Sequence, residues 1–265
     1  MTKQAIRMAL AACVVAGVSG CAAMATGSAS ATASASPAAP PHLAEMDGMT
    51  KLIVDGQPFI CVAGELMNST SSDFKAIQSI LPRLAQAHLN TVLSVVSWDL
   101  IEPREGEFDF SMIDNQLKAA RANHLRLILL WMGSWKNGLS HYPPAWVKAN
   151  QARFPRVVNA DGSTLEILST LSEANRDADA RAFAAVMKHL REVDSKDHTV
   201  IAMQVENEAG VLGSARDFCD AANKAYNGPV PAQLMGYLEA HKDHLLPEFK
   251  AVWDAAGDKT SGTWE

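Results

Sequence analysis

Two polar side chains with the potential for chemistry, Asn207 and Glu208, closely follow an apolar run over residues 199–203. A short apolar run predicts a buried strand, so both side chains would lie at its carboxyl end, where parallel α/β folds place their chemistry. A carboxylic acid there could protonate the departing oxygen of a glycosidic bond, a reaction that also requires a second carboxylate. In isolation, the Glu-Asn-Glu sequence is more typical of a solvated strand end, so its setting on the chain must decide.

Alternating apolar runs and amphipathic stretches after residue 50 predict the elements that position these side chains. Repeated strand–helix units imply a parallel sheet with right-handed crossovers. The expected strands span residues 59–66, 91–98, 125–132 and 199–206, and the expected helices span residues 73–88, 111–123, 177–193 and 231–255. Pro82 should kink or split the first helix, because proline cannot donate a helical hydrogen bond.

Polar and aromatic residues recur at the expected strand ends. No glycine-rich, phosphate-cradling turn follows the first strand, so the pattern favours a closed barrel over a nucleotide-binding sheet. The recurring residues are Glu65, Trp98 with Asp99, Trp135, and Asn207 with Glu208. Either Trp98 or Trp135 could stack on a sugar ring or pack in the core, and Trp135, in a loop flanked by glycines, is the better candidate for stacking.

Two segments carry a family resemblance. Residues 98–111, WDLIEPREGEFDFS, resemble the segment after the second strand in clan A glycoside hydrolases, and residues 204–210, QVENEAG, resemble the signature of their fourth strand. Residues 64–66, 133–138 and 144–147 resemble the bacterial branch of glycoside hydrolase family 35, the β-galactosidases. The resemblance covers residues 52–265 and implies a (β/α)8 TIM-barrel fold.

The resemblance implies that Glu208 is the general acid/base and that Asn207 binds the neighbouring 2-hydroxyl group of the sugar. We expect partial burial of Glu208, because such an acid needs a raised pKa. Val95 and Ser134 stand where many family members have a Tyr and a Glu that contact galactose. The replacement contacts to the sugar would come from Glu65, Asp99 and Asn137, in addition to Trp98 and Trp135.

The chain shows four strand–helix units where a closed barrel needs eight. The resemblance places the nucleophile at the end of the seventh strand, so we expect this chain to be the amino-terminal part of an enzyme, with the acid/base but without the nucleophile. The expected activity is retaining hydrolysis of β-galactosides. The alternatives are another clan A β-glycosidase similar to family 42, or a non-catalytic, lipid-anchored carbohydrate-binding protein. None of these requires a cofactor or a metal.

The amino terminus is typical of an export signal. Lys3 and Arg7 precede an apolar stretch over residues 8–18, and the sequence VSGC ending at Cys21 resembles a bacterial lipobox. Cys21 would then carry the lipid, and the protein would lie in the periplasm or at the cell surface, anchored to the outer membrane. Alternatively, an ordinary signal peptide is cut near residues 22–25. The predicted organisation is a signal over residues 1–20, a linker over residues 21–48 and a hydrolase domain over residues 49–265.

The composition is that of a globular protein. Of the 265 residues, 48% are hydrophobic and 20% are charged, which is enough apolar sequence for a sizeable core. The net charge of −6 comes without a basic block, so the sequence carries no signal for nucleic-acid binding. Cys61 and Cys219 lack metal-site spacing and could be joined in a disulfide or be buried thiols. The oligomeric state stays open.

Overall fold

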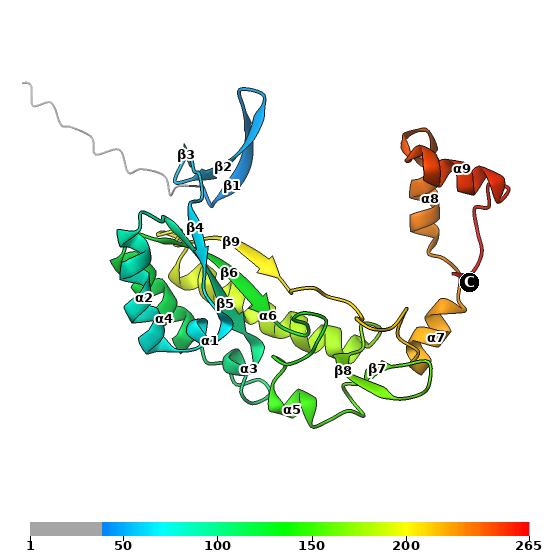
Figure 1. Ribbon diagram of the computed structural model, residues 1–265, viewed down its shortest axis with the longest axis horizontal. Coiled ribbons are helices and arrows are strands. Elements are labelled where there is room, and N and C mark those ends of the chain that lie inside the picture. The colour runs from blue at the N-terminus through cyan, green and yellow to red at the C-terminus, as the bar shows by residue number, and fades with distance from the viewer. Residues whose placement is uncertain (1–38, 265) are drawn as a thin grey trace, which may run out of the picture. The chain divides into compact units, whose positions relative to one another are not determined.

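The computed structural model describes residues 39–264, and its central feature is a sheet of four parallel strands (Figure 1). The strands lie side by side in the order β4 (Ala63–Glu65), β5 (Thr91–Ser97), β6 (Arg126–Met132) and β9 (Val200–Val205). Each strand joins the sheet on the same side as the last, so the order does not reverse as it does in a doubly wound sheet. This confirms the predicted fold class, an α/β fold of TIM-barrel type with about half of the barrel in this chain.

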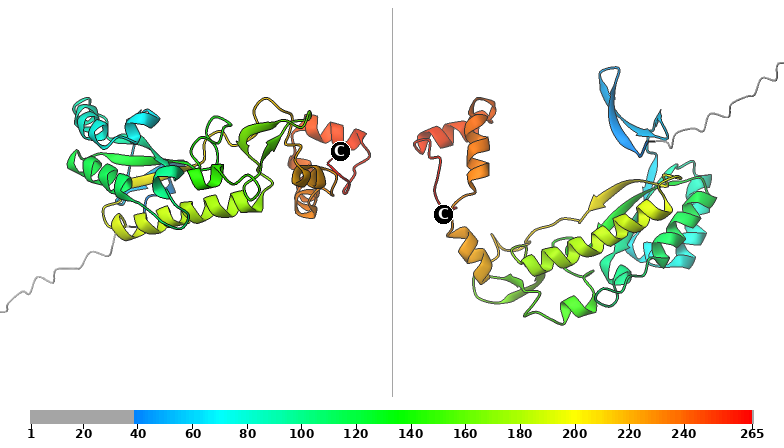
Figure 2. Two further views of the ribbon diagram at one scale, coloured as in Figure 1. Left: turned by 90° about the horizontal axis from the view of Figure 1, so that it is seen from below. Right: turned by 180° about the vertical axis from the view of Figure 1, so that it is seen from behind.

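Three long helices supply the apolar cover of the sheet. They are α2 (Phe74–Gln86), α4 (Ser111–Ala122) and α6 (Glu173–Val193), and Figure 2 shows α6 running along the sheet. Their buried side chains recur three or four residues apart and form one core with alternate residues of β5 and β6. The core includes Ile77 and Leu81 of α2, Ile113 and Leu117 of α4, Ala182 and Val186 of α6, and Val92, Val96, Leu127 and Leu129 of the strands.

A smaller apolar cluster lies on the opposite face of the sheet. It consists of Val95, Leu130 and Met132, with the partly buried Tyr142 packed against it. The two clusters occupy opposite faces because successive side chains of a strand alternate in direction. Val95, where the family resemblance expects a sugar-contacting Tyr, is therefore a packing residue on this face.

Several short elements lie in the connections and were not predicted. The four-residue helices are α1 (Asn68–Ser71), α3 (Trp98–Ile101) and α5 (Ala145–Lys148). The long connection between β6 and α6 also holds an antiparallel pair, β7 (Arg156–Val158) and β8 (Thr164–Leu168). The helix α6 begins at Glu173, earlier than predicted, because the Ser172 hydroxyl accepts a hydrogen bond from the Asn175 amide and caps the first turn.

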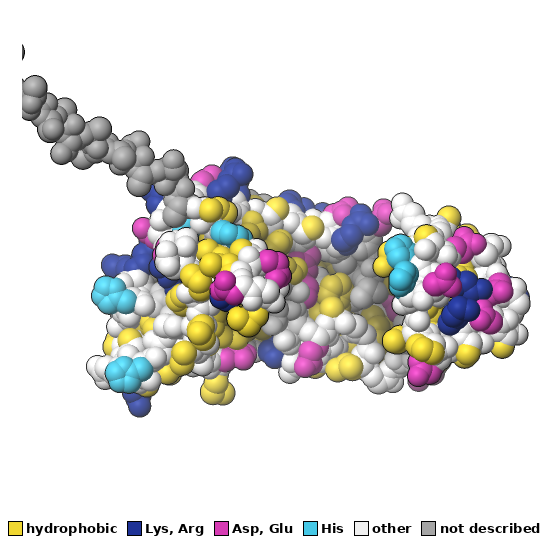
Figure 3. All heavy atoms as spheres, turned by 90° about the horizontal axis from the view of Figure 1, so that it is seen from above, with side chains coloured by type: hydrophobic (Ala, Val, Ile, Leu, Met, Phe, Trp, Pro, Cys, Tyr) yellow, Lys and Arg dark blue, Asp and Glu magenta, His cyan; other side chains and the backbone are white. Residues whose placement is uncertain are grey.

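A small antiparallel sheet precedes the barrel strands and begins within the segment that we predicted as a linker. It comprises β1 (His42–Met46), β2 (Met49–Val54) and β3 (Gln57–Pro58), so residues 42–48 of the expected linker are structured. Asp47 and Gly48 both adopt positive φ, which suits a two-residue hairpin turn. The apolar side chains of Leu43, Met46, Met49, Ile60 and Val62 are exposed. Apolar side chains also gather on the face that Figure 3 shows.

The predicted helix over residues 231–255 is wrong as a single element. It consists of α8 (Ala232–Ala240), a 3₁₀ turn (Lys242–His244) and α9 (Pro247–Ala255), because Pro247 starts a new helix and cannot continue the previous one. The preceding α7 (Asp220–Tyr226) was missed. By contrast, Pro82 lies inside α2 without splitting it.

Residues 39–264 contain neither a membrane-spanning helix nor a disulfide. No helix in this range has the length and apolar character needed to cross a bilayer. Cys61 and Cys219 are free, and Cys61 is exposed, so they form neither the disulfide nor the pair of buried thiols that the sequence left open. Cys21 and the predicted signal over residues 1–20 lie outside the described residues.

Candidate active site

The chain leaves β9 through an irregular backbone that determines where its carboxylates point. Glu206 and Glu208 have φ values of 65° and 50°, in the left-handed region that few residues other than glycine adopt. This conformation breaks the alternation of the strand, so Glu206 and Glu208 do not share one face as a regular strand would require. Strained backbone of this kind is concentrated at functional sites, which supports this strand end as the candidate site.

The Glu206 carboxylate binds the backbone of the loop that follows β6. Its Oε1 accepts a hydrogen bond from the Ser134 amide at 3.0 Å, and its Oε2 accepts one from the Trp135 amide at 2.8 Å. The family resemblance implies a supporting role for Glu206 beside the acid, paired with an arginine or a backbone amide, and these two bonds are of the second kind. Glu206 thus joins the ends of two neighbouring strands.

Asp179 of α6 reaches the same loop from the helical side. Its Oδ1 accepts a hydrogen bond from the Trp131 indole at 2.9 Å, and its Oδ2 accepts from the Ser134 amide at 2.8 Å and from the Ser134 hydroxyl. Burial, and then the hydrogen bond and charge of Asp179, raise the pKa of Glu206 to about 9, although the amides of Trp135 and Ser134 act in the opposite direction. Glu206 is therefore protonated at neutral pH.

Asn207 and Glu208 lie beside the same loop. The Asn137 amide faces Asn207 Oδ1 at 3.4 Å, and the Gly138 amide donates to the Glu208 carbonyl at 3.2 Å. The structure therefore brings together three predicted residues, Asn137, Asn207 and Glu208. Glu208 is exposed, so the partial burial that we expected around it is not found in the described residues.

Trp135 is the aromatic residue that the structure leaves available at this site. It is partly exposed, and its indole donates to the Leu168 carbonyl at 3.2 Å, which fixes the orientation of the ring. The ring lines a cavity of about 270 Å³ that also contains the side chains of Glu206 and Asp179. The stacking role of Trp135 stays a prediction.

The Trp98 ring packs in the protein core and does not face the site. The side chain is 0% exposed, its indole donates to Glu102 Oε2 at 2.8 Å, and it packs edge-on against Trp146. A ring without exposed surface offers no face to a sugar, so the predicted substrate contact of Trp98 is wrong in this structure. Glu102, the first residue of the EPREGEF segment, is buried. Its carboxylate also accepts a hydrogen bond from the Gly106 amide at 2.8 Å and forms an ion pair with Arg181, so this glutamate has a structural role.

Glu65 and Asp99 lie at the carboxyl ends of β4 and β5. Glu65 is exposed. The Asp99 amide donates to the Tyr142 carbonyl at 2.9 Å, while Asp99 Oδ1 is buried and has no partner within residues 39–264. A buried oxygen is out of reach of a ligand hydroxyl unless its neighbours move, so the sugar contact of Asp99 stays a prediction.

Asp179 is the residue of this site that the sequence analysis missed. A signal was present, because α6 buries a stripe containing Asn175, Ala178, Ala182 and Val186, and Asp179 is an ionisable residue within it. A buried aspartate on the apolar side of a helix needs a polar partner. The partner could not be identified from sequence, since Ser134 is 45 residues away.

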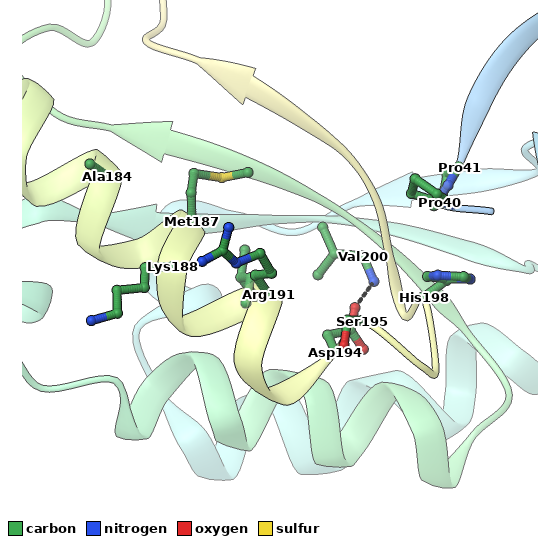
Figure 4. A pocket seen from close by; sticks show the side chains of 11 residues that line it. Pro40, Pro41, Ala184, Met187, Lys188, Arg191, Asp194, Ser195, His198 and Val200 are labelled. Atoms are coloured by element: carbon green, nitrogen blue, oxygen red, sulfur yellow. Dashed lines mark hydrogen bonds between the residues drawn. The ribbon is translucent and has the colours of Figure 1, made fainter. Parts of the chain in front are cut away.

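A larger cavity lies elsewhere (Figure 4). It has a volume of about 820 Å³ and is lined by α6 together with Pro40, Pro41, His198 and Val200. Val200 begins β9, so this cavity is at the amino end of the strand and Glu206 is roughly 20 Å away at about 3.3 Å per residue. Its carboxylate, Asp194, is engaged with the amides of Thr199 and Val200 and with Arg121. It is therefore not part of the candidate active site.

No cluster of three His, Cys, Asp or Glu side chains suited to a metal ion occurs within the part of the chain that the structure describes. The polar groups at the carboxyl ends of β6 and β9 are carboxyl, amide and hydroxyl groups. Such groups can bind the hydroxyls of a neutral ligand and can transfer a proton.

Comparison with known proteins agrees with a sugar-cleaving site. The β-galactosidase model of glycoside hydrolase family 42 matches residues 68–254. A β-galactosidase of Xanthomonas manihotis is 32% identical over 178 residues, which are 61% of this chain and 25% of that protein. A β-galactosidase of an Arthrobacter species is 30% identical over 120 residues, which are 44% of this chain and 16% of that protein. The chain thus spans a quarter or less of the length of these relatives.

Among solved structures, the polyextremophilic β-galactosidase of the Antarctic haloarchaeon Halorubrum lacusprofundi is similar to this chain with a TM-score of 0.49 and 22% identity, over 63% of this chain and 24% of that protein. The family 42 match covers more than half of the chain. It supports the alternative named from the sequence, a family 42-like enzyme, and the assignment to family 35 is not shown. The chain therefore belongs to the β-galactosidase family 42 of the glycoside hydrolases.

Proposed function

We propose that this protein acts on β-galactosides as a retaining glycoside hydrolase and that Glu208 is its general acid/base. The observation that carries the proposal is the position of Glu208, exposed at the carboxyl end of β9 beside Asn207. A carboxylic acid at the open end of a barrel strand can protonate a departing glycosidic oxygen. Asn207, whose amide can both donate and accept hydrogen bonds, would bind the adjacent sugar hydroxyl.

Glu206 is the competing carboxyl group for the acid role. It has the raised pKa that a general acid needs, but both of its oxygens are engaged with the backbone amides of Ser134 and Trp135. Glu208 has its side chain free in solvent. An acid must come within hydrogen-bond reach of the departing oxygen, so geometry favours Glu208.

The sugar contacts proposed here come from the surrounding strand ends. Trp135 would stack on a pyranose face, and Asn137, Asp99 and Glu65 would bind hydroxyl groups. Retention requires a second carboxylate roughly 5 Å from the acid, on the other side of the anomeric carbon. That nucleophile is not assigned within residues 39–264. The reaction itself requires no cofactor.

Hydrolysis of an aryl β-galactoside tests the proposal. The chain and a form of the protein extended by the coding sequence after residue 265 are purified without residues 1–41 and assayed side by side. We expect turnover in the extended form and little or none in the chain, because the chemistry needs both carboxylates. Absence of turnover in both forms, with aryl β-galactoside and a panel of other aryl β-glycosides, would contradict the proposed function.

We further propose that the protein is exported and tethered to the outer membrane by a lipid on Cys21. The support is the positive and then apolar leader followed by VSGC, with the Ala-, Ser- and Pro-rich stretch that precedes β1 acting as a tether. A tethered enzyme would meet β-galactoside oligosaccharides or polysaccharides outside the cytoplasm.

A further inference from the structure

Glu206 and Asp179 form a pair of neighbouring carboxyl groups that takes no direct part in the proposed hydrolysis. The Ser134 amide donates to both groups, to Asp179 Oδ2 at 2.8 Å and to Glu206 Oε1 at 3.0 Å. Because one amide donates to both, the two carboxyl groups lie side by side, close enough to share a proton. A hydrogen bond between carboxyl groups needs a proton, because two carboxylates in contact repel each other.

The space between these groups is closed on the side of Gly133, while on another side both groups line the cavity of about 270 Å³. A Cβ atom on Gly133 would lie 2.4 Å from Glu206 Oε1, 2.4 Å from the Trp131 indole nitrogen and 2.6 Å from Asp179 Oδ1. Such distances are far below normal contact, so no water or cation can enter from this side without moving the loop. Arg176, which lines this cavity, pairs with Asp177, and no ion pair within residues 39–264 reaches Asp179 or Glu206, so one shared proton would balance their charge.

The hydrogen bonds indicate which residue carries the proton. Asp179 accepts three bonds from protein donors, the Trp131 indole and the amide and hydroxyl of Ser134, so both of its oxygens already act as acceptors. Glu206 accepts two bonds, one on each oxygen, and retains the capacity to donate to Asp179 when protonated. The assignment of the proton to Glu206 satisfies every group.

The loop over residues 134–138, which Glu206 and Asp179 bind at its start, also contacts the candidate acid. Downstream of Ser134 and Trp135, the Asn137 amide faces Asn207 Oδ1 and the Gly138 amide donates to the Glu208 carbonyl. Residues 134–138 are thus attached in succession to Glu206, Asn207 and Glu208. Loss of the first attachment would release the others, because the remaining contacts, at 3.4 and 3.2 Å, are long.

We propose that Glu206 is a positioning residue that shares one proton with Asp179 and so holds the loop over residues 134–138 against the strand end that carries Asn207 and Glu208. The positioning of Glu208 rests on the proposed function, whereas the shared proton does not. The other charged side chain that lines the same cavity is Arg176 of α6, which pairs with Asp177.

The first test is the pH dependence of unfolding of the full chain and its Glu206→Gln variant. Glutamine retains an oxygen that accepts a backbone amide and an NH₂ group that donates to Asp179, but it does not titrate. The folded protein keeps the Glu206 proton up to about pH 9, and the unfolded chain releases it near the ordinary glutamate pKa of about 4.3. The stabilisation from Glu206 is therefore complete below this lower pH and is lost as the pH rises toward 9.

Relative to Glu206→Gln, the unfolding equilibrium constant of the wild-type chain should rise about tenfold per pH unit between pH 5 and pH 9, because one proton separates the two states. The ratio to the variant cancels the titration of the other facing groups. A ratio that is constant with pH would overturn the shared proton.

The second test is direct observation of the proton. Infrared spectra of the chain with ¹³C-labelled glutamate side chains should show a protonated carboxyl band at pH 7 that is absent in Glu206→Gln and disappears above pH 10. Absence of the band from the wild-type chain at pH 7 would also overturn the proposal. Asp179→Asn should lower the pH at which the band disappears, since it removes the partner's hydrogen bond and charge and leaves burial as the cause that raises the pKa of Glu206; if this variant does not fold, the two measurements on Glu206→Gln decide by themselves.

The positioning role is tested in the extended protein by conservative rescue. Glu206→Ala should lower kcat by about a hundredfold with a smaller change in KM, since small displacements of a catalytic group have effects of this size. Glu206→Gln should restore most of this kcat. Equal kcat for Glu206→Ala and wild type would overturn the positioning role. If the extended protein hydrolyses nothing but the proton is observed, the proposed function fails and the shared proton stands.

Discussion

The backbone amide of Gly138 donates a hydrogen bond to the carbonyl of Glu208 at 3.2 Å, so a loop after β6 holds the candidate acid through its main chain. Gly138 has a φ of +64°, and a Cβ there would lie 2.4 Å from Leu212 Cγ. Glycine is therefore required for the close approach of the two segments. The main chain of Glu208 is thus held by the loop, while its side chain stays free for proton transfer.

Glu208→Gln in the extended protein should reduce kcat/KM for galactosides with poor leaving groups by about 10²–10⁴-fold, because the amide cannot protonate the departing oxygen. Activated aryl galactosides should lose less, since their leaving groups need little acid assistance. Steady-state kinetics with both substrate types measures the difference, and Glu192→Gln, on the exposed side of α6, is the matched control. An equal loss on both substrate types would contradict the acid role.

Gly133→Ala should destabilise the chain by about 1–3 kcal/mol, because the added methyl group collides with Glu206, Asp179 and Trp131 at distances down to 2.4 Å. Gly236→Ala is the control, since Gly236 lies within α8 and a Cβ there meets nothing within 4 Å. Alanine at position 236 should be neutral or stabilising by up to about 1 kcal/mol. Urea denaturation of both variants measures the contrast. Similar stability of the two variants would show that the loop adapts.

Trp98→Phe should lower the free energy of unfolding by about 1–3 kcal/mol, because the buried Glu102 loses its indole donor. Since Trp98 has no exposed surface, KM should hardly change in the folded enzyme. Trp135→Phe should have the opposite effect, a higher KM with a smaller change in stability, because Trp135 is partly exposed and its indole contacts one carbonyl. Denaturation and steady-state kinetics of both variants check this, and a raised KM only for Trp98→Phe would reverse the two assignments.

Cys21→Ala should abolish incorporation of radiolabelled palmitate during growth and release the protein from the membrane fraction, if Cys21 carries the lipid. Cys13→Ala lies within the predicted signal and should leave labelling unchanged. Labelling followed by gel autoradiography makes the comparison. Release of unlabelled wild-type protein into the soluble exported fraction would instead support an ordinary signal peptide cut near residues 22–25.

The pattern of side chains in the sequence was sufficient to locate the principal elements of the barrel. The strands over residues 91–97, 126–132 and 200–205 appear close to their predicted positions, because short apolar runs that alternate with amphipathic stretches are typical of buried parallel strands. The short β1–β3 sheet was missed although the Asp47-Gly48 turn signals a hairpin. The break before α9 was missed although Pro247 signals a helix start.

The residues of the candidate site could be named only in part. The sequence by itself determined which strand ends carry Asn137, Asn207 and Glu208, since strand polarity places them at one edge of the sheet. Only the tertiary structure decided that Trp98 is buried, that Glu206 binds the loop after β6, and that Glu206 and Asp179 accept hydrogen bonds from the same Ser134 amide. These outcomes depend on long-range packing and on two left-handed backbone conformations, which no local spacing of residues specifies.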